Sequence, residues 1–494
     1  MKKPPSRRLV ALLCAQLLLA GCAQAQPPVP WPEPRTIEPV HAFPRVRPNF
    51  QAPSATHCAR PVATREVPGF VDGGHPGHGD LHEESAGVPT SPRAGAAAKA
   101  ERHAYAERSA AAPASPTPPP APAPAPAAAA APQLRDGHGA HDGVAQRQWQ
   151  APPPVTAGVV DDNADFSAYL AFRGRTRVDH RERDVRARHL LQVRDARGRP
   201  VGDAEVAVLA ASGHAMWART DAGGRTWLHP NAFDPARSAH YDVVVRKGGA
   251  QAFARLARGQ KSAVEVVLDT APPPARARLD LVFLVDATGS MGDEIEKLKL
   301  SLRAITAEVA SLPSRPDICL GLVAYRDRGD AFLLRSHDFT NDVGAFLEQA
   351  LYPLRAGGGG DYPEAMGEAL HETVHQLSWR GEGATRLVVL LADAPPHLHQ
   401  GAPHYDETML AALGKGIKLF GVGASGLDRQ GEFIQRQLAQ YTGGKFVFLT
   451  YADAHRPGSG PGRETVHDVN NYSVDTLDRL VVRLVSEELA KGSR

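Results

Sequence analysis

The chain has 494 residues and a formal net charge of +2, which is enough length for more than one domain and too little charge to select a class of partner. Its 46 glycines and 43 prolines indicate that part of this length does not form a packed core. We find no nucleic-acid-binding motif, and the four cysteines do not provide a disulfide framework.

The N-terminus has the pattern of an export signal. Basic residues at positions 2, 3, 7 and 8 precede an apolar run at residues 9–19 that is too short to span a bilayer. Residues 19–22 read Leu-Ala-Gly-Cys, which resembles the lipobox of bacterial lipoproteins. The resemblance implies that residues 1–21 are a cleaved signal peptide and that Cys22 is acylated and anchors the chain in the membrane.

The residue after the lipobox cysteine indicates a destination. In Gram-negative lipoproteins a residue such as Ala23 implies the outer membrane. The alternative is a soluble secreted or periplasmic protein, because residues 23–25 also fit the small-residue rule for signal cleavage.

Residues 22–155 are rich in Pro, Ala, Gly and His and show no apolar periodicity, so we predict a disordered linker. The Ala/Pro tract at residues 113–132 favours a polyproline spacer of roughly 60 Å. Two histidine clusters in this range could bind Zn²⁺, Cu²⁺ or Ni²⁺ loosely, but solvated low-complexity sequence is the favoured interpretation. They comprise His75, His78 and His82, and His138 and His141.

Two further cysteines remain, Cys58 in the linker and Cys319 in the apolar run 318–324. The run predicts that Cys319 is a buried thiol. A disulfide between the two is allowed in an oxidising compartment, but free cysteines are the prediction.

Residues 156–271 carry short strand patterns separated by turn signals, about seven in all, and predict a small β-sandwich. The turns and strands around residues 198–208, 220–228 and 241–249 resemble carboxypeptidase regulatory-like or transthyretin-like sandwiches. Ten arginines and four acids lie between Arg173 and Arg199. A solvated strand face is favoured there over a basic surface for anionic lipids or envelope polymers.

After the proline linker at residues 272–274, strands and helices alternate over residues 278–494. This alternation predicts a doubly wound α/β fold with a mainly parallel sheet. The predicted strands cover residues 279–285, 318–325, 331–336, 387–392, 417–422 and 445–449, with 331–336 as an antiparallel edge. The predicted helices extend from the first loop to about 312, and cover 343–351, 363–377, 405–413, 431–441 and 474–489.

Three loops at the carboxyl ends of these strands carry oxygen ligands. The first contains Asp286, Thr288 and Ser290, the second is a glycine run that ends in Asp361, and the third contains Asp393. Ligands of open α/β sheets bind at this edge, and carboxylates with hydroxyls suit hard divalent cations.

These residues resemble the von Willebrand factor type A (VWA) domain. The resemblance implies a metal-ion-dependent adhesion site that holds Mg²⁺, or Mn²⁺ or Ca²⁺, with one position open for a partner carboxylate. Adhesion-type members carry a threonine where this chain has Asp361, and a third carboxylate would weaken the capture of another. His397, His399 and His404 are expected at the rim rather than as zinc ligands.

The sequence therefore predicts an envelope-anchored, non-enzymatic lipoprotein that binds an unknown protein partner through a divalent cation. It predicts no catalytic residues. The alternatives are a metal-dependent phosphoester hydrolase, although no nucleophile paired with a base is found, and a scaffold in which the metal is purely structural.

Overall fold

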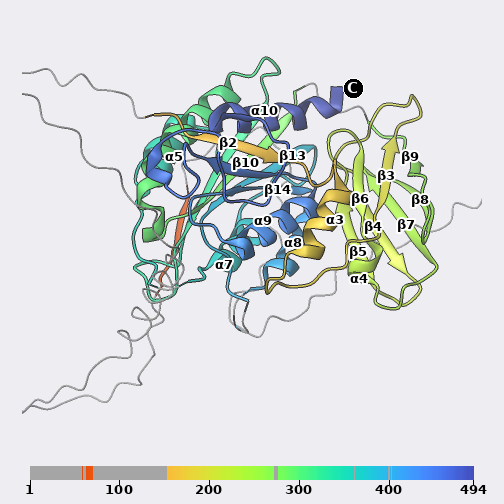
Figure 1. Ribbon diagram of the computed structural model, residues 1–494. Helices are drawn as coiled ribbons and strands as arrows, with labels where there is room; N and C mark the ends of the chain where they lie inside the picture. The colour runs from red at the N-terminus through yellow and green to blue at the C-terminus, as the bar shows by residue number, and fades with distance from the viewer. Residues whose placement is uncertain are drawn as a thin grey trace, which may run out of the picture. The chain divides into compact units, whose positions relative to one another are not determined.

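The computed structural model describes residues 58, 63–69, 153–271, 276–360, 362–398, 401 and 403–493 (Figure 1). The predictions for the export signal, Cys22, the histidine clusters of the linker, Asp361 and His399 lie outside these residues. Among the described helices none has the length and apolar character needed to cross a membrane.

The largest element is a nine-stranded sheet in the order β1-β12-β11-β10-β13-β14-β15-β2-β16. Its centre is parallel and consists of β10 (Arg278–Asp286), β11 (Asp317–Tyr325), β13 (Ala384–Ala392), β14 (Ile417–Gly423) and β15 (Phe446–Thr450). The run Leu281 to Val285 is fully buried, as expected for a strand covered on both faces. The predicted α/β fold is confirmed.

One edge of the sheet differs from the prediction. β12 (Leu334–Thr340) is antiparallel to β11, as expected, but it is not the edge strand. β1 (Thr64–Val67) pairs outside it, with Thr64 opposite His337. This short strand lies inside the range predicted to be linker. Because its four residues carry no periodic pattern, its position becomes visible only through its pairing with β12.

The other edge is also built from a segment upstream of the parallel strands. β2 (Thr156–Val160) runs antiparallel to β15, and β16 (Val474–Thr476) pairs with the other side of β2. Residues 156–160 therefore belong to the α/β sheet, although the β-sandwich predicted for residues 156–271 includes them.

Cys58 and Cys319 form a disulfide, with a Cα–Cα distance of 6.0 Å, so the prediction of free cysteines is wrong. The two residues are 261 positions apart, and spacing at that range carries no information about contact. The pairing of β1 with β12 brings the upstream segment beside β11, which carries Cys319. Both cysteines are buried.

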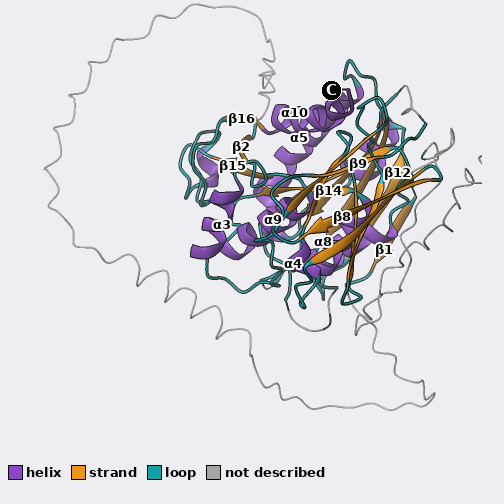
Figure 2. Cartoon of the chain, turned by 90° about the vertical axis from the view of Figure 1, so that its right-hand side faces the viewer, coloured by secondary structure: helices purple, strands orange, loops and turns teal. Residues whose placement is uncertain are grey.

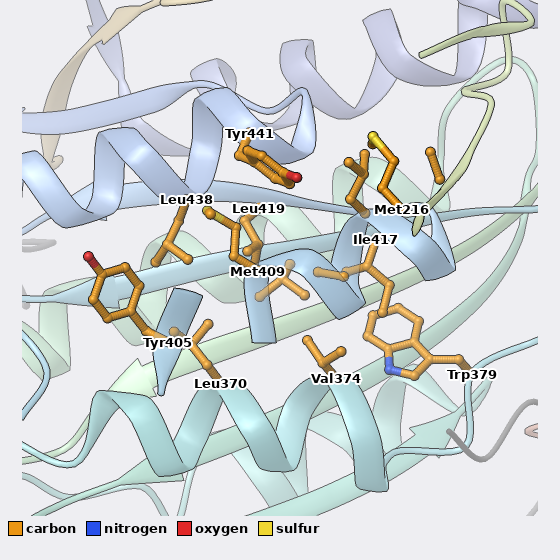
Figure 3. Close-up of a cluster of buried hydrophobic side chains, with 14 of the residues drawn as sticks. Met216, Leu370, Val374, Trp379, Tyr405, Met409, Ile417, Leu419, Leu438 and Tyr441 are labelled. Atoms are coloured by element: carbon orange, nitrogen blue, oxygen red, sulfur yellow. The ribbon is translucent and has the colours of Figure 1, made fainter. Parts of the chain in front are cut away.

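Helices cover both faces of the sheet (Figure 1). Successive side chains of β10 point to opposite faces, so Leu281 and Phe283 join one core cluster and Val282 and Leu284 the other. α5 (Gly292–Ala310) and α10 (Leu477–Ala490) complete the first cluster. α7 (Met366–His371), α8 (Tyr405–Lys415) and α9 (Arg429–Thr442) complete the second, part of which is shown in Figure 3.

Two predicted helices are irregular. The prediction for 343–351 becomes α6 (Val343–Ala345) followed by a π-helical stretch, η2 (Phe346–Leu351). The prediction for 363–377 becomes α7 and a second π-helical stretch, η3 (Glu372–Gln376), so the helix starts three residues later than expected. π-Helical stretches leave no distinct apolar period in a sequence.

Residues 189–267 form seven further strands in two sheets, β6-β3-β9 and β5-β4-β7-β8. Figure 1 labels these strands, and Figure 2 shows β8 and β9 from a second direction. Buried side chains of both sheets, such as Leu191 and Val206, belong to one core cluster. The assignment to a particular sandwich family stays a prediction. The strands are β3 (His189–Arg194), β4 (Glu205–Ala210), β5 (Ala215–Arg219), β6 (Arg225–Leu228), β7 (His240–Lys247), β8 (Ala250–Ala257) and β9 (Val264–Val267).

These strands pack against the α/β core through buried charges. Arg386, at 1% exposure, donates to both oxygens of Asp203, and Arg219 donates to the same carboxylate at 3.1 Å. α3 (Phe166–Arg175) and the segment after it lie along α9, which is buried on all sides from Gly431 to Thr442.

Several arginines of the arginine-rich segment, such as Arg177, Arg194 and Arg197, are exposed, as the solvated interpretation expected, whereas others form contacts that the sequence did not indicate. Arg175 pairs with Asp468, Arg183 with Asp406 and Arg199 with Asp195. Arg188 stacks over the rings of Phe166 and Trp227.

Candidate metal site

The first site loop begins where β10 ends. Asp286 is fully buried, and its Oδ1 accepts hydrogen bonds from the Thr288 backbone N–H at 2.9 Å and from Thr288 Oγ1 at 2.7 Å. Thr288 Oγ1 also lies 3.0 Å from Ser290 Oγ. The three residues predicted for this loop are therefore together, and their oxygens converge within a single turn.

Asp393 follows β13, whose neighbour in the sheet is β10, and it is 4% exposed. Burial, followed by the charge of Asp393, raises the pKa of Asp286 to about 7, although the hydrogen bonds from Thr288 act in the opposite direction. Burial also raises the pKa of Asp393, against a hydrogen bond from Ser290. The two carboxylates are close enough to repel each other.

Each of these carboxylates has one oxygen available. In the described part of the chain neither Asp286 Oδ2 nor Asp393 Oδ1 has a partner in hydrogen-bond geometry, although both atoms are buried and the Tyr325 hydroxyl lies near enough to Asp286 to lower its pKa. An unsatisfied buried carboxylate oxygen costs free energy, and two facing carboxylates raise that cost. A cation between them would remove both penalties.

The glycine run forms the second loop. Gly358 and Gly359 have φ values of +76° and +69°, which favour glycine. The Gly289 N–H donates to the Gly358 carbonyl at 2.9 Å, and a Cβ on Gly359 would lie 2.9 Å from Thr288 Cβ. Glycine is therefore required for the second loop to approach the first. Asp361 lies outside the described residues, so its role stays a prediction.

Sequence reasoning missed Glu364 as a site residue. It is 4% exposed, and its backbone N–H donates to the Pro395 carbonyl at 3.1 Å, which places it against the third loop. A Cβ on Gly359 would lie 2.9 Å from Glu364 Oε1. The signal was an acidic residue directly after the glycine run, but its burial could not be read from the sequence.

Glu294 is a second acid that the sequence did not single out. It is 5% exposed, lies near enough to raise the pKa of Asp393, and accepts a hydrogen bond from the Ser425 backbone N–H at 3.2 Å. The Tyr451 hydroxyl also donates to it. Three acids, Asp286, Asp393 and Glu294, therefore lie close together at the centre of the site.

The described donors fit a hard divalent cation. Within the described residues no group of three or more His, Cys, Asp or Glu side chains is arranged to hold a metal, so a ligand set drawn from them consists of two carboxylates and two hydroxyls. Such an all-oxygen set suits Mg²⁺ or Ca²⁺, with water in the other positions.

The rim histidines are placed differently from one another. His397 Nε2 lies 2.9 Å from Asp327 Oδ1, and His404 is the residue that precedes α8.

Comparisons with known proteins give the following. Residues 280–450 match the von Willebrand factor type A domain, and this range includes β11, β13, β14, β15 and all but the first two residues of β10. The alpha-protein kinase vwkA of Dictyostelium discoideum is 32% identical over 120 residues, 24% of this chain and 19% of that protein. An ariadne-like RING finger protein of Acanthamoeba polyphaga mimivirus is 32% identical over 122 residues, 25% of this chain and 12% of that protein. The chain thus spans less than a fifth of either relative.

Two solved structures are also similar. The conserved hypothetical protein BatB of Bacteroides thetaiotaomicron has a TM-score of 0.30 and 18% identity, over 43% of this chain and 98% of that chain. The pilus adhesin SpaC of Lactobacillus rhamnosus GG, in its open conformation, has a TM-score of 0.26 and 16% identity, over 42% of this chain and 31% of that chain.

Proposed function

Because residues 280–450 form a VWA domain, we propose that the chain is an exported, non-enzymatic binding protein that captures a protein partner through a divalent cation. Asp286, Thr288, Ser290 and Asp393 hold the cation, and Mg²⁺ is the first choice, ahead of Mn²⁺ and Ca²⁺. The partner belongs to the envelope or the extracellular space.

One observation carries the proposal: two buried carboxylates lie close together, and neither Asp286 Oδ2 nor Asp393 Oδ1 has a partner in hydrogen-bond geometry among the described residues, although the Tyr325 hydroxyl lies near Asp286. No described Lys or Arg side chain is among the main groups that shift the pKa of Asp286 or Asp393. A fold that kept such a pair for packing alone would be destabilised by it. Cation binding explains why both acids occupy this position.

The same residues indicate what kind of partner is captured. Thr288 and Ser290 contribute neutral oxygens, so Asp286 and Asp393 are the only charged ligands of this set. Their two negative charges balance a divalent cation, and the occupied site then carries no excess negative charge. When bound, the cation would supply a coordination position for an acidic group of the partner. Asp361 or Glu364, if drawn into the set, would compete with that acidic group.

Metal binding can be tested on the full chain by calorimetric titration with Mg²⁺ after removal of metals with EDTA. We expect saturable binding by the wild type and none by Asp286→Ala. Asp338→Ala is a matched control, because Asp338 also accepts a backbone N–H, that of Ser378 at 2.9 Å, but away from the site loops. Binding that survives in Asp286→Ala would contradict the assignment of the site.

Partner capture is tested with envelope fractions, by comparing the wild type and Asp286→Ala in Mg²⁺ and then in EDTA. A partner retained only by the wild type in Mg²⁺ supports the proposal. If both proteins capture it equally under both conditions, the cation is structural and the chain is a scaffold. Turnover of phosphoesters that Asp393→Asn abolishes would replace binding by hydrolysis.

We propose that the chain is anchored through an acylated Cys22 in the outer membrane of a bacterial envelope, with a soluble secreted or periplasmic form as the alternative. The disulfide between Cys58 and Cys319 supports export, because disulfides persist in oxidising compartments. Cys22→Ser should move the protein from the membrane fraction to the soluble fraction. An unchanged distribution would exclude the lipid anchor.

A further inference from the structure

The turn between β11 and β12, residues 326–330, contacts all three site loops, and we call it the bracket turn. Its first residue reaches the first loop, because Arg326 Nε donates to the Ala287 carbonyl at 3.2 Å. Arg326 Nη2 also donates to the Arg355 carbonyl at 3.1 Å, just before the glycine run. Arg326 thus connects the Asp286 loop to the start of the second loop.

The last residue of the bracket turn holds the glycine loop. Asp330 Oδ2 accepts the backbone N–H of Gly359 at 2.8 Å and that of Asp327 at 3.0 Å. A Cβ on Gly358 would lie 2.3 Å from the Asp330 carboxyl carbon, so this carboxyl group fills the space that a side chain would need. The loop conformation and the Asp330 carboxylate therefore depend on each other.

Two backbone hydrogen bonds connect the glycine loop to the first loop, so the position of one loop restricts the position of the other. Gly289 N–H donates to the Gly358 carbonyl at 2.9 Å, and Gly357 N–H donates to the Ala287 carbonyl at 3.0 Å. These bonds flank Thr288, whose hydroxyl lies against Asp286. A displacement of the glycine loop would therefore displace the oxygens proposed to hold the cation.

The middle of the bracket turn reaches the third loop. Asp327 Oδ1 lies 2.9 Å from His397 Nε2, and His397 follows the Asp393 loop. Arg328 Nη2 donates to Glu368 at the start of α7 at 2.7 Å and to the Gly401 carbonyl at 3.2 Å.

We infer that the bracket turn sets the relative positions of the three site loops and that Asp330 is a positioning residue for the cation site. The consequence for metal affinity rests on the proposed function, whereas the consequence for loop order does not. Groups that orient ligands without touching the metal change its affinity about 10- to 100-fold when they are removed. Asp330 acts on Thr288 through the backbone, so the same range applies to it.

Two substitutions separate position from charge. Asp330→Ala removes both hydrogen bonds, and we expect Mg²⁺ affinity to fall about 10-fold or more in calorimetric titration of the full chain. Asp330→Asn keeps an oxygen that can accept both N–H groups but removes the negative charge, and we expect its affinity to stay within about 3-fold of the wild type. An equal loss in both variants would overturn the inference, because charge and not position would then be responsible.

Hydrogen–deuterium exchange of the metal-free protein tests the bracket turn without any metal. Asp330→Ala should increase exchange in peptides that contain Gly289 and Gly359, whereas Asp330→Asn and Asp338→Ala should not. If the wild type binds no Mg²⁺ but this exchange pattern appears, the proposed function fails and the bracket turn stands. If exchange at Gly289 and Gly359 is unchanged in Asp330→Ala, the inference fails whatever the metal result.

Discussion

Asp286→Asn should abolish cation binding at the proposed site and at the same time stabilise the metal-free protein. In EDTA the folded chain must keep the Asp286 carboxylate buried beside Asp393, which raises the pKa of Asp286 from 3.8 to about 7. The asparagine side chain has no charge, and its oxygen can still accept the two hydrogen bonds from Thr288. The substitution thus removes the repulsion and keeps the local structure.

The magnitude of the stabilisation by Asp286→Asn and its dependence on pH follow from this pKa shift. Between pH 3.8 and about 7 the unfolded chain binds fewer protons at Asp286 than the folded chain, so the stability of the metal-free wild type falls as the pH rises. At pH 8 this pKa shift corresponds to a difference in the free energy of unfolding of about 4 kcal/mol between the variant and the metal-free wild type. This value is an upper limit, because Asp393 contributes to the same repulsion. At pH 5 the folded carboxyl group is mostly protonated, and the expected difference shrinks to about 1–2 kcal/mol.

The assay is thermal or urea unfolding of both proteins in EDTA at pH 5 and pH 8, repeated with Mg²⁺. We expect Asp286→Asn to be more stable than the wild type in EDTA, by a larger margin at pH 8, and we expect Mg²⁺ to stabilise only the wild type. A variant that is less stable than the wild type in EDTA at pH 8 would show that the carboxylates are not in repulsive contact. A margin that does not change with pH would refute the electrostatic explanation.

Three further outcomes are expected for the rest of the fold. Asp203→Ala leaves the buried Arg386 without its ion-pair partner and should lower the free energy of unfolding by about 3–5 kcal/mol in urea titrations, more than any surface substitution. His229 is buried against Tyr441, and burial lowers its pKa to about 3, so the stability that it contributes falls as the pH drops below 6.5; His229→Phe should flatten this part of a stability profile from pH 7 to 4. Cys58→Ser removes the cross-link to Cys319 and should cost about 2–4 kcal/mol, whereas an unchanged melting temperature would show that β1 holds without it.

The central fold was predictable because each of its central strands has a local apolar pattern that can be recognised without its neighbours. Residues 281–285 are continuously apolar and stop at an aspartate, and such a run has few alternatives to a buried parallel strand that ends at a site. Asp393 follows the same pattern on the neighbouring strand. The convergence of Asp286, Thr288, Ser290 and Asp393 was expected because all four follow the carboxyl ends of strands in a mainly parallel sheet, and the structure places these residues together.

The elements that the sequence did not reveal are those defined by a partner far along the chain. β1 has four residues in a proline-rich stretch, and only its pairing with β12 makes it a strand. The residues of the bracket turn look like an ordinary polar hairpin connection, because Asp and Gly favour turns in any context. Glu364 looked like part of a helix start, and its burial depends on the third loop. Pairwise tertiary contacts of this kind leave no local pattern.

The segment upstream of the VWA domain also supports the site. The disulfide holds Cys58 at β11, β1 continues from there along β12, and the Gly69 carbonyl accepts the Gly329 N–H of the bracket turn at 2.9 Å. A Cβ on Gly69 would lie 2.2 Å from the Asp330 carbonyl oxygen, so the two backbones are in direct contact. Asp330 in turn holds the glycine loop against Thr288. The proposed cation site therefore depends on residues outside 280–450. A fragment limited to that range would lose the support for its second loop together with the strands at both edges of the sheet, β1 on one side and β2 and β16 on the other.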